Sequence, residues 1–253
     1  MNAPGYDSRV SKVRRLLHPI VQKIHEVSAW AGAISPDTTS AQRFGHLGWG
    51  TLIAYPQGSI FGEQSIHIGD NTLISRDVTL SVGYMPGVAT LPDSGLTIGA
   101  RCVVGARSTI TAHGRIDIGD DVWLGKDVFI SDASHGYQDP NVPIGRQMGQ
   151  HQPVTIGAGS WIGHGAVILP GTQIGKQVVV AAGAVVRGDI PDHSVVAGVP
   201  ARIVRRFEPE VGWISSSGDV RPIIDFEEAA QGLAGLDSAV EKFTGPRPAA
   251  RSE

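Results

Sequence analysis

The chain has 253 residues with a net charge of −3, and this charge gives no basic excess for nucleic-acid binding. Glycine accounts for 33 residues, roughly twice its usual share, while charged and aromatic residues make up only 18% and 6%. The single cysteine, Cys102, excludes an intramolecular disulfide framework and a cysteine-cluster zinc site. No apolar run reaches the roughly 20 residues of a membrane span, and no signal peptide is visible, so we expect a cytoplasmic protein.

Residues 7–31 are predicted to form an amphipathic helix, kinked at Pro19. Its apolar residues recur at helical spacing, with arginine and lysine on the opposite side. We expect this helix to pack on the rest of the chain or on a neighbouring subunit, and contact with a membrane surface is the alternative. The apolar residues are Val10, Val13, Leu17, Ile20, Val21, Ile24 and Val27.

A six-residue repeat runs through the middle of the chain. An aliphatic residue recurs at every sixth position, and the longest run is Ile156, Ile162, Ile168, Ile174, Val180 and Val186. A glycine or another small residue often follows the aliphatic, and we expect these glycines to adopt backbone angles that other residues avoid. Four places after the aliphatic, most units have another small or β-branched residue: Thr72, Val78, Cys102, Ser108, Val122, Val128, Ser134, Ser160, Ala166, Thr172, Val178 and Ala184.

This period predicts the fold. A repeat of six cannot keep one helix face apolar, but it suits short strands separated by tight turns, with the aliphatic and the small residue pointing inward. Three units make a triangular coil of about 18 residues, and coils stack at roughly 4.8 Å. We therefore expect a mainly β stack of coils over 46–206, an N-terminal helical segment over 1–45 and a tail over 207–253. Residues 226–243 of the tail are predicted to form a short helix, and the last ten residues to be disordered.

The repeat is interrupted in three places. Two extra residues separate Ile110 from Ile118, and residues 81–95 keep the register but have a loop-like composition. The largest gap lies between Ile130 and Ile156, where SDASHGYQDPNVPIGRQMGQHQPVT predicts a loop of about twenty residues. Long loops of this kind inside a compact repeat are usually functional or disordered.

These runs resemble the hexapeptide-repeat acyltransferases, and most closely the galactoside, maltose and polysaccharide O-acetyltransferases. The resemblance covers roughly residues 58–206, in HIGDNTLIS, IDIGDDVWLGKDVFISDASHGYQDPNVPI, PVTIGAGSWIGHGAVILPGTQIG and DIPDHSVVAGVPARIVRRF. It implies a left-handed parallel β-helix and a homotrimer. It also implies that acetyl-CoA, the acyl donor, binds in a groove between adjacent subunits, and that a carbohydrate or glycan hydroxyl is the acceptor.

The family resemblance places the general base at His135, at the start of the long loop. A hydroxyl has to lose its proton as it attacks a thioester, and histidine, with an unperturbed pKa near 6.5, suits that task. Asp132 is a candidate to orient the imidazole, while Ser134, Asp139 and a backbone carbonyl are the alternatives. The family motif further places Trp161, Gly163, His164 and Ala182 along the coenzyme groove. Arg205 matches an arginine near the nucleotide phosphates.

This sequence departs from the galactoside enzymes in several positions. Their phosphate-binding lysine falls on Gly188, and the adjacent Arg187 is a candidate substitute. Their acceptor-binding asparagine falls on Ser75, and no acidic residue stands between Asp139 and Pro153 to match their loop glutamate. We therefore expect an acceptor other than a simple galactoside.

The acceptor pocket is predicted to be shaped by Tyr137 from the long loop and by Tyr84 and Met85 from the 81–95 loop. The HGYQDPNVPI segment resembles exopolysaccharide and glycan O-acetyltransferases. We interpret His113, His151 and His193 as turn or surface residues.

Three other functions are compatible with the repeat. An N-acyltransferase acting on an amino sugar or xenobiotic amine would use the same coenzyme groove. A γ-class carbonic anhydrase would bind zinc through three histidines; IGHGAVILPG supplies His164, but the next expected ligand falls on Leu169, so we expect no metal. A non-catalytic scaffold would keep the stack alone, and the presence of His135 and the AGVPAR run argues against it.

Overall fold

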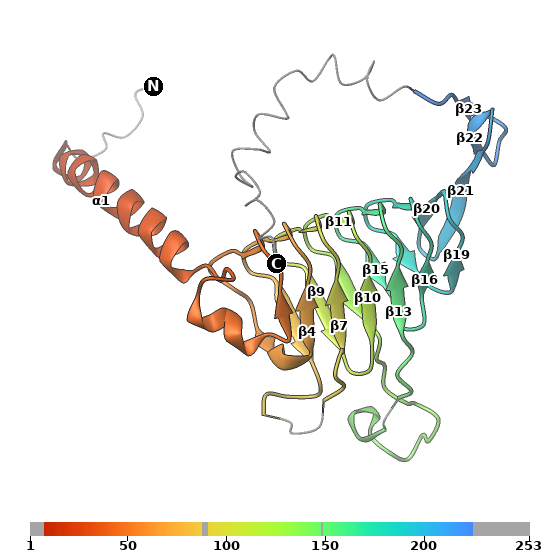
Figure 1. Cartoon of the computed structure of the whole chain (residues 1–253), viewed down its shortest axis with the longest axis horizontal. Helices are drawn as coiled ribbons and strands as arrows, with labels where there is room; N and C mark the ends of the chain where they lie inside the picture. The colour runs from red at the N-terminus through yellow and green to blue at the C-terminus, as the bar shows by residue number, and fades with distance from the viewer. Residues whose placement is uncertain (1–7, 88–90, 148, 225–253) are drawn as a thin grey trace, which may run out of the picture.

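The computed structural model describes residues 8–224 except 88–90 and 148, with side chains from residue 13 onward. Short parallel strands wind into a stack of coils with three flat sheets (Figure 1). Each coil visits the first, second and third sheet in turn, as β13, β14 and β15 do before the chain returns to the first sheet at β16. The prediction of three six-residue units per coil is confirmed.

Each sheet collects every third strand of the stack. The first sheet contains β1 (His46–Leu47), β4 (Ile66–Ile68), β7 (Leu96–Ile98), β10 (Ile116–Ile118), β13 (Val154–Ile156), β16 (Gln173–Ile174) and β19 (Asp189–Ile190). The second contains β2 (Leu52–Ile53), β5 (Leu73–Ile74), β8 (Val103–Val104), β11 (Trp123–Leu124), β14 (Trp161–Ile162), β17 (Val179–Val180), β20 (Ser194–Gly198), β21 (Ala201–Glu208), β22 (Gly212–Ser215) and β23 (Val220–Arg221). The third contains β3 (Ile60–Phe61), β6 (Thr79–Val82), β9 (Thr109–Ala112), β12 (Phe129–Ser131), β15 (Val167–Ile168) and β18 (Val185–Val186). The 3-10 helices are η1 (Thr39–Arg43), η2 (Glu63–Ser65) and η3 (Ile144–Arg146).

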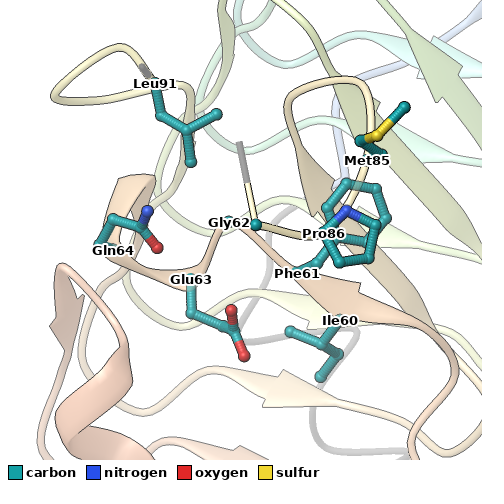
Figure 2. Close-up of a pocket in the computed structure, with 9 residues that line it drawn as sticks. Ile60, Phe61, Gly62, Glu63, Gln64, Met85, Pro86 and Leu91 are labelled. Carbon is teal, nitrogen blue, oxygen red and sulfur yellow. The ribbon is translucent and has the colours of Figure 1, made fainter. Parts of the chain in front are cut away.

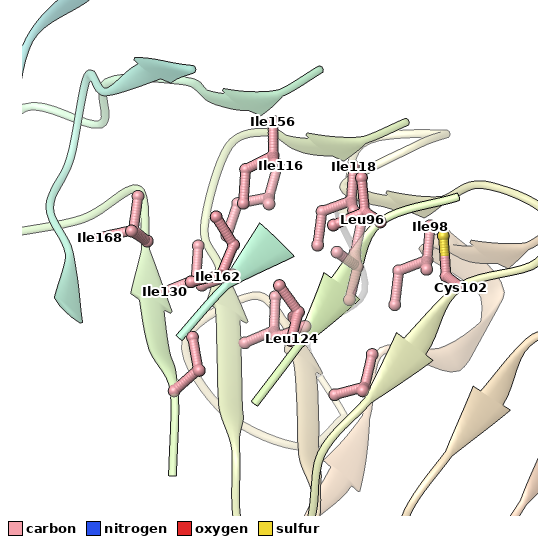
Figure 3. Close-up of a cluster of buried hydrophobic side chains, with 14 of the residues drawn as sticks. Leu96, Ile98, Cys102, Ile116, Ile118, Leu124, Ile130, Ile156, Ile162 and Ile168 are labelled. Atoms are coloured by element: carbon pink, nitrogen blue, oxygen red, sulfur yellow. The ribbon is translucent and has the colours of Figure 1, made fainter. Parts of the chain in front are cut away.

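The core is a column of aliphatic side chains inside the coils. Ile98, Ile118 and Ile156 are paired in register on neighbouring strands of the first sheet and are almost completely buried (Figure 3). Each such side chain contributes about 1.5–3 kcal/mol through burial. The small residues four places on are buried as predicted, except for Ser134, which is exposed because the chain has left the coil after β12.

The glycines that follow the aliphatics are required by space, which corrects the sequence-based reason. Their φ angles are not in the left-handed region; that conformation occurs two residues later, at positions such as Arg101 and Asp121. A Cβ on Gly99 would lie 2.6 Å from both the backbone N of Asp120 and the carbonyl C of Gly119 on the next coil. These glycines therefore let successive coils approach backbone to backbone.

The N-terminal helix α1 (Ser8–Gly32) extends away from the coils (Figure 1). Its aliphatic side chains from Val13 to Val27 are exposed to solvent, and Trp30 is 82% exposed. Of the two arrangements predicted for the helix, the described side chains do not show packing on the coil stack of the same chain, and packing on a neighbouring subunit stays a prediction. Only its C-terminal end is tied to the stack, through a hydrogen bond that Gln57 donates to the carbonyl of Gly32. No helix in the described part of the chain is long and apolar enough to cross a membrane.

The C-terminal end of the stack is an antiparallel meander. Strand β21 turns back on β20, and β22 and β23 extend the same sheet. The repeat ends where this reversal occurs, and β21 continues past Arg206 to Glu208. The helix predicted over 226–243 and the last ten residues lie outside the described residues.

Replacing Gly99 with alanine is expected to destabilise the protein by about 2 kcal/mol or more, because the new Cβ meets backbone atoms that cannot rotate away. Chemical denaturation measures the change. Gly145→Ala is the matched control, because a Cβ at Gly145 meets nothing within 4 Å. Equal unfolding free energies for the two variants would contradict the close-approach argument.

Candidate active site

Three connections leave the stack at one corner, between the third and first sheets. They follow β6, β9 and β12, which are neighbours in the third sheet. The first is the loop 83–95, the second the short turn 113–115 and the third the long loop 132–153. Because their starting strands are hydrogen-bonded neighbours, the loops emerge side by side, and residues as far apart in sequence as Tyr84 and His151 come into contact.

A cavity of about 250 Å³ lies where these loops meet, and His135 is one of its lining residues. The side chain of His135 is exposed, so a ligand can reach the imidazole. The lining has no aspartate, glutamate, lysine or arginine. It consists of Tyr84, Thr111, His113, Phe129, Ser131, Ala133, Ser134, His135, Gly149 and His151.

Two further histidines, His113 and His151, share this cavity with His135. The sequence analysis interpreted them as turn or surface residues, and His113 does lie in the 113–115 turn, but it did not predict that both line the cavity. The hydroxyl of Tyr84 lies 2.6 Å from Nε2 of His151. The Tyr84 and His113 ring centroids are 4.6 Å apart, and those of His113 and His151 are 5.3 Å apart. The interruptions of the repeat could have indicated that both histidines lie near His135, because His113 stands at the two-residue insertion and His151 near the end of the long loop.

Asp132 is fully buried and organises this corner. Its carboxylate accepts three backbone N–H bonds, from His113 at 2.8 Å and from Gly114 and Arg115 at 2.7 Å each. Its carbonyl accepts the N–H of Gln152 at 2.8 Å. In the described structure its side-chain hydrogen bonds all go to the 113–115 turn, and none goes to His135. The geometry therefore favours a role in positioning the turn over the predicted role of orienting the His135 ring.

The pKa of His113 lies below the ordinary histidine value. Partial burial of the ring is the largest cause, and the neighbouring His151 and His135 add to it because like charges disfavour protonation. The carboxylate of Asp132 acts in the opposite direction but does not reverse the shift. His113 is therefore neutral at pH 7 and can donate or accept a hydrogen bond.

The four residues predicted along the coenzyme groove lie near another corner, between the second and third sheets. Gly163 is packed so closely on the next coil that a Cβ would lie 2.5 Å from the backbone N of Ala182. Nδ1 of His164 is 3.6 Å from a carboxylate oxygen of Asp127, which Arg107 also pairs at 2.7 Å. The indole of Trp161 is 56% exposed on the second sheet. The structure thus brings Trp161, Gly163, His164 and Ala182 together on one outer edge.

An apolar ladder runs along the outer face of the second sheet. Trp161 and Trp123 are paired in register, and with Asp121, Gly159 and Ser160 they line an open hollow of about 480 Å³. Further apolar residues continue the line in register on neighbouring strands: Leu52, Leu73, Val103, Val179 and Val195.

The two arginines predicted near the coenzyme phosphates lie on different sheets. Arg187 follows β18 of the third sheet and is exposed. Arg205 lies on β21 of the second sheet, where its guanidinium donates to the carbonyl of Asp219 at 3.2 Å.

The remaining predicted acceptor residues lie apart from the His135 cavity. Tyr137 is 76% exposed and does not line it. Met85 lines a second cavity of about 300 Å³ together with Phe61, Glu63 and Leu91 (Figure 2). Neighbouring residues of the 83–95 loop, Tyr84 and Met85, thus line different cavities.

The described residues contain no group of three or more histidine, cysteine, aspartate or glutamate side chains that could hold a metal ion. This includes the three histidines of the His135 cavity. His164, the histidine shared with the carbonic anhydrase segment, pairs with Asp127.

Two known protein families match the six-residue repeat of this chain. Residues 153–188 match the family described as bacterial transferase hexapeptide (six repeats), and residues 95–131 match the hexapeptide repeat of succinyl-transferase. A putative lipopolysaccharide biosynthesis O-acetyl transferase, WbbJ of Escherichia coli, is 42% identical over 90 residues, 33% of this chain and 46% of the relative. Galactoside O-acetyltransferase of Escherichia coli is 49% identical over 55 residues, 22% of this chain and 27% of the relative. The chain thus spans less than half the length of these curated relatives.

The fold is also that of a solved acyltransferase. The N-acyltransferase AntD from Bacillus cereus, in complex with dTDP and 3-hydroxybutyryl-CoA, has a TM-score of 0.57 and 19% identity, over 81% of this chain and 97% of its own. This chain has the left-handed parallel β-helix fold. At this identity the likeness concerns the fold alone.

Replacing Asp132 with asparagine is expected to lower the unfolding free energy by about 1–3 kcal/mol, because an amide cannot accept three N–H bonds and its own NH₂ faces a backbone donor. Urea denaturation measures the loss. Asp139→Asn, in the exposed part of the same loop, is the control and should change stability little. A fully stable Asp132→Asn protein would refute the positioning role.

Proposed function

We propose that the chain transfers an acyl group, most simply acetyl, from coenzyme A to a hydroxyl of a carbohydrate or glycan, because residues 95–131 and 153–188 match hexapeptide-repeat transferase families and an O-acetyl transferase is among its relatives. The observation that carries the proposal is the accessible imidazole of His135 in an uncharged, hydroxyl-rich cavity at a corner of the stack. The names of two relatives, a lipopolysaccharide O-acetyl transferase and a galactoside O-acetyltransferase, support a sugar acceptor.

In the proposed reaction, His135 acts as general base. Its neutral imidazole removes the proton of the acceptor hydroxyl while the oxygen attacks the thioester carbon, which gives a tetrahedral intermediate. The carbon–sulfur bond then breaks, and the coenzyme thiolate takes the proton from the imidazolium. The products are the ester and free coenzyme A, and His135 returns to its neutral form.

The coenzyme is proposed to lie along the edge formed by Trp161, Gly163, His164 and Ala182. The close packing of Gly163 on the coil of Ala182 keeps this part of the edge, between the side chains of Trp161 and His164, to small residues, which suits the thin pantetheine arm. Arg187 and Arg205 are the proposed partners of the nucleotide phosphates, because guanidinium groups pair well with phosphate oxygens.

The apolar ladder of the second sheet supports a homotrimer. A cyclic trimer uses heterologous contacts, in which one surface of a subunit meets a different surface of the next. We propose that the ladder faces the third sheet of the neighbouring subunit. The groove between them would then have Trp161 on one wall and His135 on the other, so the site would be complete only in the trimer.

Replacing Leu73 in this ladder with arginine is expected to convert trimers to monomers, because it places a charge in an apolar contact. Light scattering coupled to size-exclusion chromatography measures the mass. Thr97→Arg puts the same side chain on the first sheet, which the proposed interface leaves free, and should stay trimeric. A monomeric unmodified protein would rule out the intersubunit groove.

Replacing His135 with alanine is expected to lower kcat by roughly 10²–10⁴-fold while the coenzyme A dissociation constant stays nearly unchanged. Release of the coenzyme thiol, measured across hydroxyl and amine acceptors, identifies the acceptor and gives the rate. The control is His25→Ala on the exposed helix α1, which should retain full activity. Equal rates in His135→Ala and the unmodified protein would end the general-base assignment.

A further inference from the structure

Three aromatic rings in the His135 cavity come from three successive coils. Tyr84 follows β6, His113 follows β9, and His151 lies at the end of the loop that follows β12; we call these three residues the ring cluster. The Tyr84 hydroxyl contacts Nε2 of His151 at 2.6 Å and thereby joins the two long loops across the His113 turn. The centroid of the Tyr84 ring is 4.6 Å from that of His113 and 5.7 Å from that of His151.

The backbone on either side of the cavity at the two histidines of the ring cluster is tied to a single residue, Asp132. The carboxylate of Asp132 fixes the backbone of His113, and its carbonyl fixes Gln152, the residue after His151. Because Asp132 is fully buried, the positions of both histidines are set before any ligand binds. Tyr84 is 52% exposed, so a ligand can reach its ring.

The cavity lining offers no carboxylate, ammonium or guanidinium group to pair with a charged ligand. Its lining contains no acidic or basic side chain apart from the histidines, and His113 is neutral at pH 7. A charged ligand group that loses part of its hydration here gains no oppositely charged carboxylate, ammonium or guanidinium partner in return, which disfavours both a carboxylate and an ammonium group. Thr111, Ser131 and Ser134 add hydroxyls that both donate and accept hydrogen bonds.

We propose that the ring cluster is the acceptor-selecting surface of the cavity, and that it favours an uncharged pyranose over a uronic acid or a protonated amino sugar. This proposal rests on the proposed acyltransferase function. The cavity volume of about 250 Å³ is below the roughly 300–1,000 Å³ of drug-sized pockets and suits one sugar ring. The aromatic rings provide apolar faces for the C–H bonds of the sugar, while the imidazole and hydroxyl groups meet its hydroxyls.

Direct binding of three glucosides to the full-length protein tests the selection. Histidine-labelled protein is titrated at pH 7 with methyl β-D-glucopyranoside, with its uronic acid and with its 2-amino-2-deoxy analogue, and the histidine ring signals are followed by NMR. We expect saturable shifts of the His113 and His151 signals with the neutral glucoside, at least tenfold weaker binding of both charged probes, and an unmoved His25 signal.

Two variants connect the binding to the ring cluster. Tyr84→Ala is expected to weaken glucoside binding at least tenfold, whereas Tyr84→Phe, which keeps the ring and loses the contact with His151, should lie between it and the unmodified protein. Equal or tighter binding of a charged probe, unchanged binding in Tyr84→Ala, or no binding of the neutral glucoside would overturn the proposal. Coenzyme A binding, measured by calorimetry on the same proteins, should be equal in all three; its absence from the unmodified protein would instead refute the proposed function.

Discussion

Close backbone contact between successive coils is the constraint on which the structure depends. Parallel neighbours sit at roughly 4.8 Å, so a corner residue that faces the next coil has no room for a side chain. Gly99 and Gly163 meet that condition, since a Cβ on either would strike backbone atoms of the next coil. The same spacing places Ile98, Ile118 and Ile156 directly above one another and builds a continuous apolar column. Neither feature tolerates an extra residue within a strand, so insertions are confined to the corners.

This confinement creates the candidate site. Loops that leave neighbouring strands of the third sheet emerge side by side whatever their length, and His113, His135 and the ring of Tyr84 are thereby brought to one cavity. A fully buried carboxylate costs free energy unless it is hydrogen-bonded. Asp132 accepts three backbone N–H bonds, which offset that cost and fix the turn that carries His113. Asp132 therefore positions the backbone around the cavity, while the imidazole of His135, the proposed base, stays accessible to a substrate.

The outer faces of the second and third sheets differ in composition and in proposed role. The second sheet presents an apolar ladder that includes Trp123 and Trp161, and its edge with the third sheet holds the proposed coenzyme residues. The third sheet carries the His135 cavity at its opposite edge. In the proposed trimer these two surfaces of adjacent subunits face each other, so the groove is formed by assembly.

The six-residue period of aliphatic residues was enough to predict the coil, because this spacing suits short strands separated by tight turns, with every third unit on its predecessor and the residue four places on turned inward. It also pointed to the corner loops, because they interrupt that period. It could not give the reason for the glycines, since the residue type does not distinguish an unusual φ from a lack of space. It did not predict that His113 and His151 line the cavity, and it left open whether α1 packs on the stack or on a neighbouring subunit. The cavity depends on the folded chain: Tyr84 and His151 are 67 positions apart, and the register of β6, β9 and β12 in one sheet is what places their loops in contact.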